Sequence, residues 1–143
     1  MEIRRISQFE DVKLAGHLFD EPPKEQATER FLADAGHHLL IAYLDGRPAG
    51  MVTGVEMTHP DKGTEMFLYE LGVDEEMQGL GIGTALVSAL ADLARERDCF
   101  GMWVVTGGDN EAAQRTYAGG GGMPEQDQVV FVWDFEQIQF EAG

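Results

Sequence analysis

The amino-acid sequence predicts an α/β fold in which helices cover a mixed β-sheet. Segments with the apolar pattern of strands alternate with segments whose apolar residues recur at helical spacing. A glycine-rich turn, Gln78–Gly83, also joins an apolar strand pattern to a long helical pattern. The chain has 143 residues, which suits one domain with a proper hydrophobic core. We therefore expect a single domain over residues 1–143.

The first part of the chain predicts one strand, two helices and a β-hairpin. Ser7 is a helix N-cap residue, and Pro22-Pro23 breaks the chain and opens the second helix. Gly36 ends that helix, and Asp45-Gly46 is a hairpin turn. The expected elements are a strand over residues 2–6, a helix over 7–19, a helix from 22 to about 35, and strands over 38–44 and 47–57.

The second part predicts three more strands and two more helices. Pro60 and Gly63 mark a loop before the central strand, and Asp109 or Asn110 is a good N-cap for the last helix. The expected elements are a strand over residues 65–73, a helix over 84–97, a strand over 100–105, a helix over 109–118 and a last strand over 129–135. The apolar stripe of the long helix consists of Leu86, Val87, Leu90, Leu93 and Ala94.

The glycine-rich turn has the spacing Q-x-x-G-x-G and leads directly into the long helix. Glycines let successive backbone N–H groups point into one concavity, and the helix N-terminus adds partial positive charge, so the turn suits a phosphate. No Lys-Ser or Lys-Thr follows its last glycine, which excludes a Walker A loop, and the spacing is not that of a dinucleotide fingerprint. The alternative is a flexible loop without a ligand.

A second motif lies downstream, with the pattern N-x-x-A-x-x-x-Y-x-x-x-G at Asn110, Ala113, Tyr117 and Gly121. Ala113 and Tyr117 are four residues apart and lie on one helical face. A small residue there allows the close approach of a slender ligand, and the phenol one turn later can reach it. The alternative is a capped helix whose tyrosine packs in the core.

The two motifs, in this order and separated by one helix and one strand, resemble those of the GCN5-related N-acetyltransferases (GNAT). The resemblance implies the GNAT fold, acetyl-CoA as cosubstrate, and a gap between splayed strands 65–73 and 100–105 that holds the cofactor's amide arm. Two departures are that no arginine accompanies the glycine loop and that Met123 follows Gly122 where Phe is usual. The expected cofactor-binding residues are Leu71, Gly72, Val73, Gln78, Gly79, Leu80, Gly81, Ile82, Gly83, Thr84, Asn110, Ala113 and Tyr117.

The length, the strand Tyr69–Val73 and the closing Val132–Phe135 are similar to those of the type I aminoglycoside 3-N-acetyltransferases. Those enzymes carry a carboxylate in an equivalent Tyr-acid-Leu strand and an acidic residue in the last strand. The resemblance implies that Glu70 and Asp134 bind a cationic acceptor. For Asp134, a strand-end acid in water is the alternative.

Amide formation requires a neutral amine, so a base must remove a proton from the ammonium form. We expect Glu70 to be this base, although strict strand alternation would leave it on a solvated face. N–H groups at Leu71 or Val73 are candidates to stabilise the oxyanion, and Tyr117 to protonate the departing CoA thiolate. Glu21, Glu25 and Glu56 are further candidates to line an acceptor cleft.

Cys99, the only cysteine, lies between the long helix and the next strand and has no paired histidine motif. It is therefore expected to be structural, and direct transfer in a ternary complex is favoured over an acetyl-enzyme. His37 and His38 are adjacent and point apart, while His17 and His59 stand alone, so no metal site is expected.

The net charge is −16, from 10 basic and 26 acidic residues. It argues against nucleic acid or an anionic membrane as partner and favours a cationic small-molecule amine; the alternative is the acidic composition of a salt-adapted organism. The lone cysteine and the absence of a signal or transmembrane pattern favour the cytoplasm. A homodimer is expected by analogy only. Competing functions are acetylation of a polyamine, peptide or protein lysine, and a non-catalytic acyl-CoA-binding module.

Overall fold

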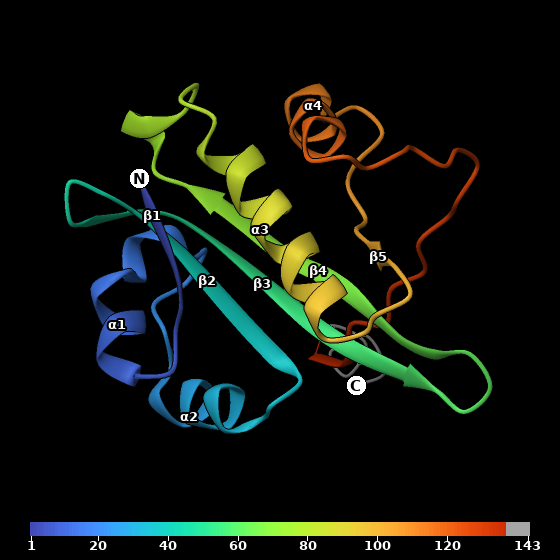
Figure 1. Cartoon of the computed structure of the whole chain (residues 1–143), viewed down its shortest axis with the longest axis horizontal. Helices are drawn as coiled ribbons and strands as arrows, with labels where there is room; N and C mark the ends of the chain where they lie inside the picture. The colour runs from blue at the N-terminus through green and yellow to red at the C-terminus, as the bar shows by residue number, and fades with distance from the viewer. Residues whose placement is uncertain (137–143) are drawn as a thin grey trace.

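A five-stranded sheet with the strand order β1-β2-β3-β4-β5 forms the centre of the protein (Figure 1). The computed structural model describes residues 1–136, so the end of the predicted domain lies outside the described part. The strands are β1 (Glu2–Arg5), β2 (His37–Leu44), β3 (Arg47–His59), β4 (Gly63–Val73) and β5 (Met102–Trp103). The first four pair antiparallel and β5 pairs parallel to β4, which confirms the predicted mixed α/β fold.

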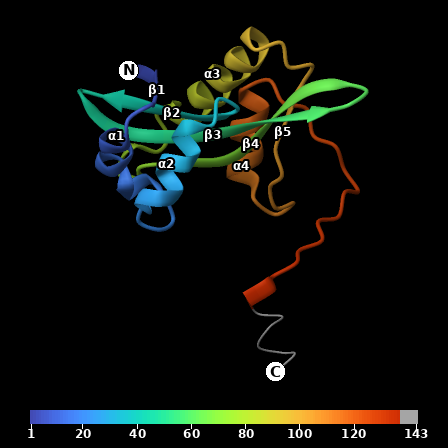
Figure 2. The same ribbon diagram turned by 90° about the horizontal axis from the view of Figure 1, so that it is seen from below.

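Helices cover both faces of this sheet (Figures 1 and 2). One face carries α1 (Phe9–Leu14), a 3-10 turn (Gly16–Leu18) and α2 (Glu25–Ala33). The other carries α3 (Ile82–Glu96), which packs against α4 (Glu111–Gly119). Leu86 and Leu90 of α3 are fully buried against Val52, Met66 and Leu68 of the sheet. A second core cluster lies beneath α1, where Val12 meets Ile41 and Met51.

The predicted helix from Ser7 to Phe19 is wrong in its details. Its N-cap position is occupied by Gln8, and α1 ends at Leu14, whose side chain is 69% exposed. A 3-10 turn follows, because Gly16 is a poor α-helix former and packs closely against Pro23. The predicted hairpin turn is confirmed, since both Asp45 and Gly46 have positive φ angles, of 51° and 78°.

The predicted strand over residues 129–135 is also wrong. No strand follows Trp103 in the described part of the chain, and β5 itself is shorter than the predicted 100–105. The apolar side chains between Val129 and Phe135 are 61% to 79% exposed, and Figure 2 shows this segment leaving the sheet. Alternation identified a segment suited to a strand, but a strand exists only where a neighbour supplies hydrogen bonds.

Candidate active site

The central strands β4 and β5 pair over a short length and then separate. Their register joins Met66 to Met102 and Phe67 to Trp103, after which β5 ends while β4 continues to Val73. The remaining length of β4 therefore has no β5 backbone beside it. This is the separation that the GNAT resemblance implies, and the glycine loop and α4 both border it (Figure 1).

The glycine loop fits a bound anion. Gly79 and Gly81 have φ angles of +83° and +80°, and no atom lies within 4 Å of the position that a Cβ would take at either residue. Gly81 occupies the N-cap position of the 15-residue helix α3, and no side chain caps this end. The space around the loop is thus open next to an uncapped helix N-terminus, the arrangement that binds phosphate. Gln78 Nε2 donates to the Val73 carbonyl at 3.5 Å and ties the loop to the end of β4.

Several predicted cofactor-binding residues also have packing roles. A Cβ at Gly72 would lie 2.5 Å from the Leu18 carbonyl oxygen, and one at Gly83 would lie 3.2 Å from Thr116 Cγ2. Ile82 belongs to the α3 core cluster, which Leu71 and Val73 also contact. Thr84 lies against Gly119 of α4, and Leu80 is 64% exposed in the loop. Contact of these residues with acetyl-CoA stays a prediction.

Helix α4 presents Ala113 and Tyr117 from a capped start. The Asn110 Oδ1 accepts a hydrogen bond of 3.1 Å from the Ala113 N–H, which confirms the predicted N-cap. Tyr117 is half-buried and packs against the α3 core cluster, so the packing alternative is part of its role. Burial raises the pKa of its phenol, and the hydroxyl therefore stays protonated at neutral pH.

A β-bulge determines where Glu70 points. The register between β3 and β4 shifts between Thr53–Glu70 and Gly54–Leu68, which leaves Tyr69 without an opposite residue. Without the extra residue, Glu70 would lie on the same face as Leu68, which is buried under α3. With it, the half-buried Glu70 instead lines cavities on the face covered by α1 and α2. Glu70 thus lies in a cavity rather than on an open sheet face, and its role as the base stays a prediction.

Burial raises the pKa of the Glu70 carboxyl above its ordinary value, and the negative charge of Asp20 raises it further. A hydrogen bond with the Thr53 side chain acts in the opposite direction. The Glu70 backbone N–H also donates to Thr53 Oγ1 at 3.0 Å, and this hydrogen bond links β4 to β3 next to the bulge. Thr53 is itself buried, so the pair is well fixed.

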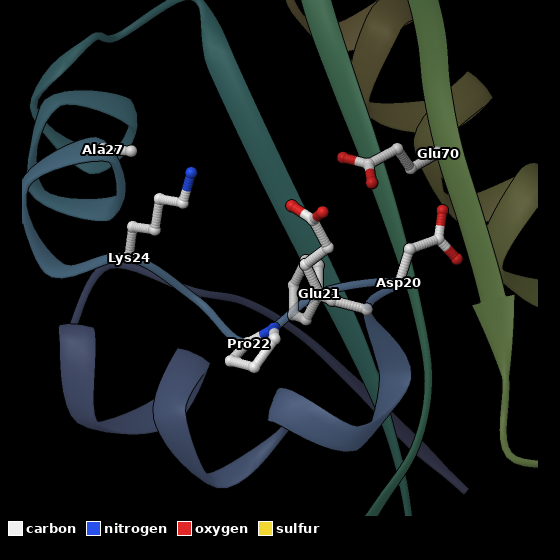
Figure 3. A pocket seen from close by; sticks show the side chains of 7 residues that line it. Asp20, Glu21, Pro22, Lys24, Ala27 and Glu70 are labelled. Atoms are coloured by element: carbon white, nitrogen blue, oxygen red, sulfur yellow. The ribbon is translucent and has the colours of Figure 1, made fainter.

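The cavity beside Glu70 has a volume of about 460 Å³ and is open to solvent. Figure 3 shows Asp20, Glu21 and Glu70 around it, with Lys24 at the start of α2. Three carboxylates and one ammonium give the cavity a net negative charge. Glu21 was a sequence candidate, whereas Asp20 was missed, although it adjoins Glu21 just before the Pro22-Pro23 break.

Three other acidic candidates lie elsewhere. Neither cavity beside Glu70 is lined by Glu25, Glu56 or Asp134. Glu56 instead accepts hydrogen bonds from His38 Nε2, at 2.6 Å, and from Arg97. Glu56 therefore has a structural role, in which it holds His38 and Arg97, rather than the predicted role in an acceptor cleft. For Asp134, acceptor binding stays a prediction that the described arrangement does not support.

Cys99 does not have the environment of a nucleophile. Its side chain packs against the α3 core cluster, and burial raises the pKa of its thiol, with a smaller contribution from Glu56. Within residues 1–136, no three metal-ligating side chains lie together. None of the helices in this range has the length and hydrophobicity to span a membrane.

Two curated proteins share short stretches of sequence with this chain. One is a mycothiol acetyltransferase of Sanguibacter keddieii, 46% identical over 54 residues, which are 38% of this chain and 17% of that protein. The other is an L-2,4-diaminobutyric acid acetyltransferase of Streptomyces coelicolor, 34% identical over 73 residues, which are 50% of this chain and 42% of that protein. The chain thus matches less than half the length of either relative.

Solved structures share the fold over nearly the whole chain. An aminoglycoside acetyltransferase from an uncultured soil metagenomic sample, in complex with sisomicin, has a TM-score of 0.83 at 18% identity, covering 94% of this chain and 95% of that one. Aminoglycoside N-acetyltransferase AAC(6')-Iy in complex with CoA has a TM-score of 0.75 at 19% identity, covering 93% and 98%. A ribosomal-protein-alanine N-acetyltransferase from Brucella melitensis biovar Abortus 2308 has a TM-score of 0.74 at 22% identity, covering 93% and 100%.

The sequence profile of the acetyltransferase (GNAT) family matches residues 3–120. This range includes β4, the glycine loop, α3 and α4, and so contains the first motif and all of the second except its last residue, Gly121. The match over most of the chain shows that this protein belongs to the acetyltransferase (GNAT) family, whose members take the acetyl group from acetyl-CoA.

Proposed function

We propose that this protein transfers the acetyl group of acetyl-CoA to an amine of a polycationic small molecule, with an aminoglycoside as the leading candidate. The observation that carries the proposal is the position of Glu70. It lies on the strand that borders the β4–β5 separation, and it lines an acidic cavity with Asp20 and Glu21. The same strand, β4, then leads through Val73 toward the glycine loop that is the candidate cofactor site.

Glu70 acts as the general base in this proposal. An acceptor amine arrives as an ammonium ion, and its proton passes to the Glu70 carboxylate, directly or through water, before the amine attacks the thioester carbonyl. The raised pKa of Glu70 brings the carboxyl closer to neutral pH, and therefore makes it a stronger base than an exposed glutamate. Asp20 also attracts the ammonium form, so the same cavity binds the substrate and deprotonates it.

Tyr117 acts as the general acid. Attack by the amine forms a C–N bond, and cleavage of the C–S bond then releases CoA as a thiolate, which takes the proton of the Tyr117 hydroxyl. The proton that the attacking nitrogen loses on becoming an amide returns to Tyr117 through water, so the hydroxyl is restored. The raised pKa keeps this proton on the tyrosine until the thiolate forms. Glu70 and Tyr117 belong to opposite faces of the sheet, because Glu70 lines the α1–α2 side and Tyr117 packs on the α3 cluster. In this proposal the two groups act on the acceptor and the thioester from opposite sides, through the separation between β4 and β5.

The acceptor class is inferred from charge and from similarity. Aminoglycosides carry several ammonium groups, which suits a cavity with three carboxylates. Two of the similar folds belong to aminoglycoside acetyltransferases. Acetylation at the 3-N position is the regiochemistry that the sequence resemblance favours, and the name AAC(6') of one neighbour makes the 6'-N position the alternative to test. Modification of this kind would confer antibiotic resistance.

A second candidate acceptor is a small diamine or diamino acid. A protein named for acetylating L-2,4-diaminobutyric acid is 34% identical to half of this chain. Such a molecule has a carboxylate as well as an ammonium group, and Lys24 is the cation of the cavity that could pair with it. Polyamines and peptide amines stay as further alternatives from the same reaction class.

The test measures CoA release from acetyl-CoA with kanamycin, gentamicin, spermidine, L-2,4-diaminobutyric acid and a lysine peptide in parallel. We expect turnover with the aminoglycosides, and NMR of the product identifies the acetylated nitrogen. Glu70→Gln is expected to lower kcat by about 100-fold or more, the usual contribution of a general base. Glu21→Gln, the control, removes a carboxylate of the same cavity and should mainly raise the KM for the acceptor.

Other outcomes decide between the alternatives. Turnover with spermidine, the diamino acid or the peptide alone would retain the reaction and reject the antibiotic as acceptor. If the protein binds acetyl-CoA but releases no CoA in the presence of any of these amines, the result would support the non-catalytic module. An unchanged kcat in Glu70→Gln would reject Glu70 as the base.

A further inference from the structure

Two adjacent residues of β3, Thr53 and Gly54, lie opposite the bulge that directs Glu70 into its cavity. Thr53 pairs with Glu70, and the next residue of β3 pairs with Leu68, so one step along β3 corresponds to two steps along β4. The two β3 residues face opposite sides of the sheet. Thr53 lines a cavity of about 190 Å³ on the α1–α2 side, together with Glu70. A Cβ at Gly54 would instead lie 2.8 Å from Leu90 Cδ1 of α3.

The hydroxyl of Thr53 contacts Glu70 in two ways. The backbone ladder is locally disrupted at a bulge, and here the Glu70 N–H donates to Thr53 Oγ1 at 3.0 Å. A hydroxyl oxygen that accepts a hydrogen bond still has one proton to donate. The Glu70 carboxylate takes this second hydrogen bond, which lowers the pKa of the carboxyl and so opposes the effects of burial and of Asp20. One hydroxyl thus holds both the backbone and the side chain of Glu70.

The surroundings of Thr53 keep its hydroxyl in place. The residue is 4% exposed, and its strand pairs on both sides, with Leu39 of β2 and with Glu70 of β4. Threonine is also branched at Cβ, which restricts the rotation of its side chain. Glu70, by contrast, is half-buried and has a longer side chain that reaches into open space. The fixed residue of the pair is therefore Thr53.

The charged groups that face Glu70 do not belong to β3. In the described part of the chain, the charged side chains that line its cavities are Asp20, Glu21 and Lys24, from the segment that leads into α2 (Figure 3). The side chains of α1, α2 and β2 that line these cavities carry no charge. A substitution at Thr53 leaves all these charges in place, so a change in the pKa of Glu70 would report on the hydroxyl.

We propose that Thr53 is the positioning residue of the general base, whose buried hydroxyl holds Glu70 at the bulge and keeps its carboxylate directed into the acceptor cavity. The inference rests on the proposed function, in which Glu70 deprotonates the acceptor amine. Thr53 acts on Glu70 and not on the reacting atoms. Without the hydroxyl, the Glu70 N–H and carboxylate each lose a partner, so the pKa of the carboxyl rises and its position becomes less fixed.

The first test follows the Glu70 carboxyl by NMR and requires no acceptor. In protein labelled with ¹³C-glutamate, the Glu70 signal is the one that disappears in Glu70→Gln, and its titration gives the pKa. Thr53→Val should raise this pKa by about one unit, the size expected when a carboxylate loses one hydrogen bond. Thr53→Ala is a second variant without the hydroxyl and should give the same direction of shift, while Thr53→Ser should restore the original value.

The matched control is Thr58→Val, on the same strand. The Thr58 hydroxyl also forms a hydrogen bond to β4, with Thr64 Oγ1 at 2.9 Å, but near the β3–β4 turn and exposed to solvent. This variant should leave the pKa of Glu70 unchanged. An unchanged pKa in both variants that lack the Thr53 hydroxyl, or an equal rise in Thr58→Val, would overturn the role of Thr53 alone.

The second test measures the pH profile of kcat/KM with the acceptor that gives the highest turnover. The base is active when deprotonated, so in Thr53→Val the acidic limb should move to higher pH. At the high-pH plateau kcat should fall by about 10- to 100-fold, because small displacements of a catalytic group are costly. Thr53→Ser should recover both the limb and the plateau. A raised pKa by NMR with an unchanged pH profile would reject Glu70 as the base, and with it both the proposed function of Glu70 and this role of Thr53.

Discussion

At the scale of single residues, the environment of Glu70 decides the proposed chemistry. The sequence predicted its role from a Tyr-acid-Leu strand, but alternation alone placed it on a solvated face. In the structure, uninterrupted alternation would instead place Glu70 beside Leu68 under α3, and the bulge at Tyr69 moves it to the face covered by α1 and α2, because one extra residue reverses the side on which the following side chains lie. Such a bulge depends on the pairing of β3 with β4, which no local pattern in β4 encodes. The sequence did not identify Asp20 for a related reason, since only the fold brings it to Glu70.

Asp20→Asn tests this electrostatic arrangement. The negative charge of Asp20 raises the pKa of Glu70, so its removal lowers that pKa. The base is active when deprotonated, and the acidic limb of the kcat/KM profile should therefore move to lower pH. Asp61→Asn is the control, because it removes the same charge in the β3–β4 turn, on the order of 20 Å along the strand from Glu70. An acidic limb that moves equally in both variants would show that net charge, rather than Asp20, is responsible.

Tyr117→Phe separates acid catalysis from packing. The ring keeps its contacts with the α3 cluster, so we expect the thermal unfolding midpoint to change little. Without the hydroxyl, kcat should fall, by less than the roughly 100-fold lower end of general acid catalysis, because a thiolate is a good leaving group. Steady-state kinetics with saturating acetyl-CoA measure the loss. An unchanged kcat would leave Tyr117 as a packing residue.

At the scale of elements, the sequence correctly predicted those that depend only on residues close together in the chain. The turn at Asp45-Gly46 and the N-cap Asn110 are local, and both are confirmed. The apolar stripe of the long helix is nearly right, with Ile82 as an additional buried member. The elements that depend on a distant partner were less predictable. β5 is short because its neighbour β4 diverges, and residues 129–135 form no strand because they do not join the described five-stranded sheet.

The glycine loop permits a controlled test of an element. Gly81→Ala introduces a side chain at φ +80°, which costs about 1–2 kcal/mol, and places a methyl group where the phosphate is expected. Gly46→Ala, at φ +78° in the β2–β3 turn, has a similar backbone cost and also points into open space. We expect similar losses of stability in chemical denaturation. Only Gly81→Ala should raise the KM for acetyl-CoA, and equal KM values would indicate that the loop holds no phosphate.

At the scale of the whole molecule, the net charge of −16 has two interpretations. A negative field steers cationic acceptors toward the cavity, and it also makes the folded chain repel itself at low salt. Both effects weaken as salt shortens the screening length from about 30 Å at 0.01 M to about 8 Å at 0.15 M. Salt should therefore stabilise the protein whichever interpretation holds, and stability alone cannot separate them.

The dependence on acceptor charge does separate them. If the field steers the substrate, kcat/KM for a multiply charged acceptor should fall as salt rises, and it should fall more steeply than for an acceptor with one ammonium group. The measurement compares both acceptors between about 0.01 and 0.15 M salt, with the unfolding midpoint recorded in the same buffers. Parallel curves for the two acceptors would reject steering and leave the acidic surface as an adaptation to salt. A steeper fall for the polycation would connect the composition of the whole chain to the three carboxylates around one cavity.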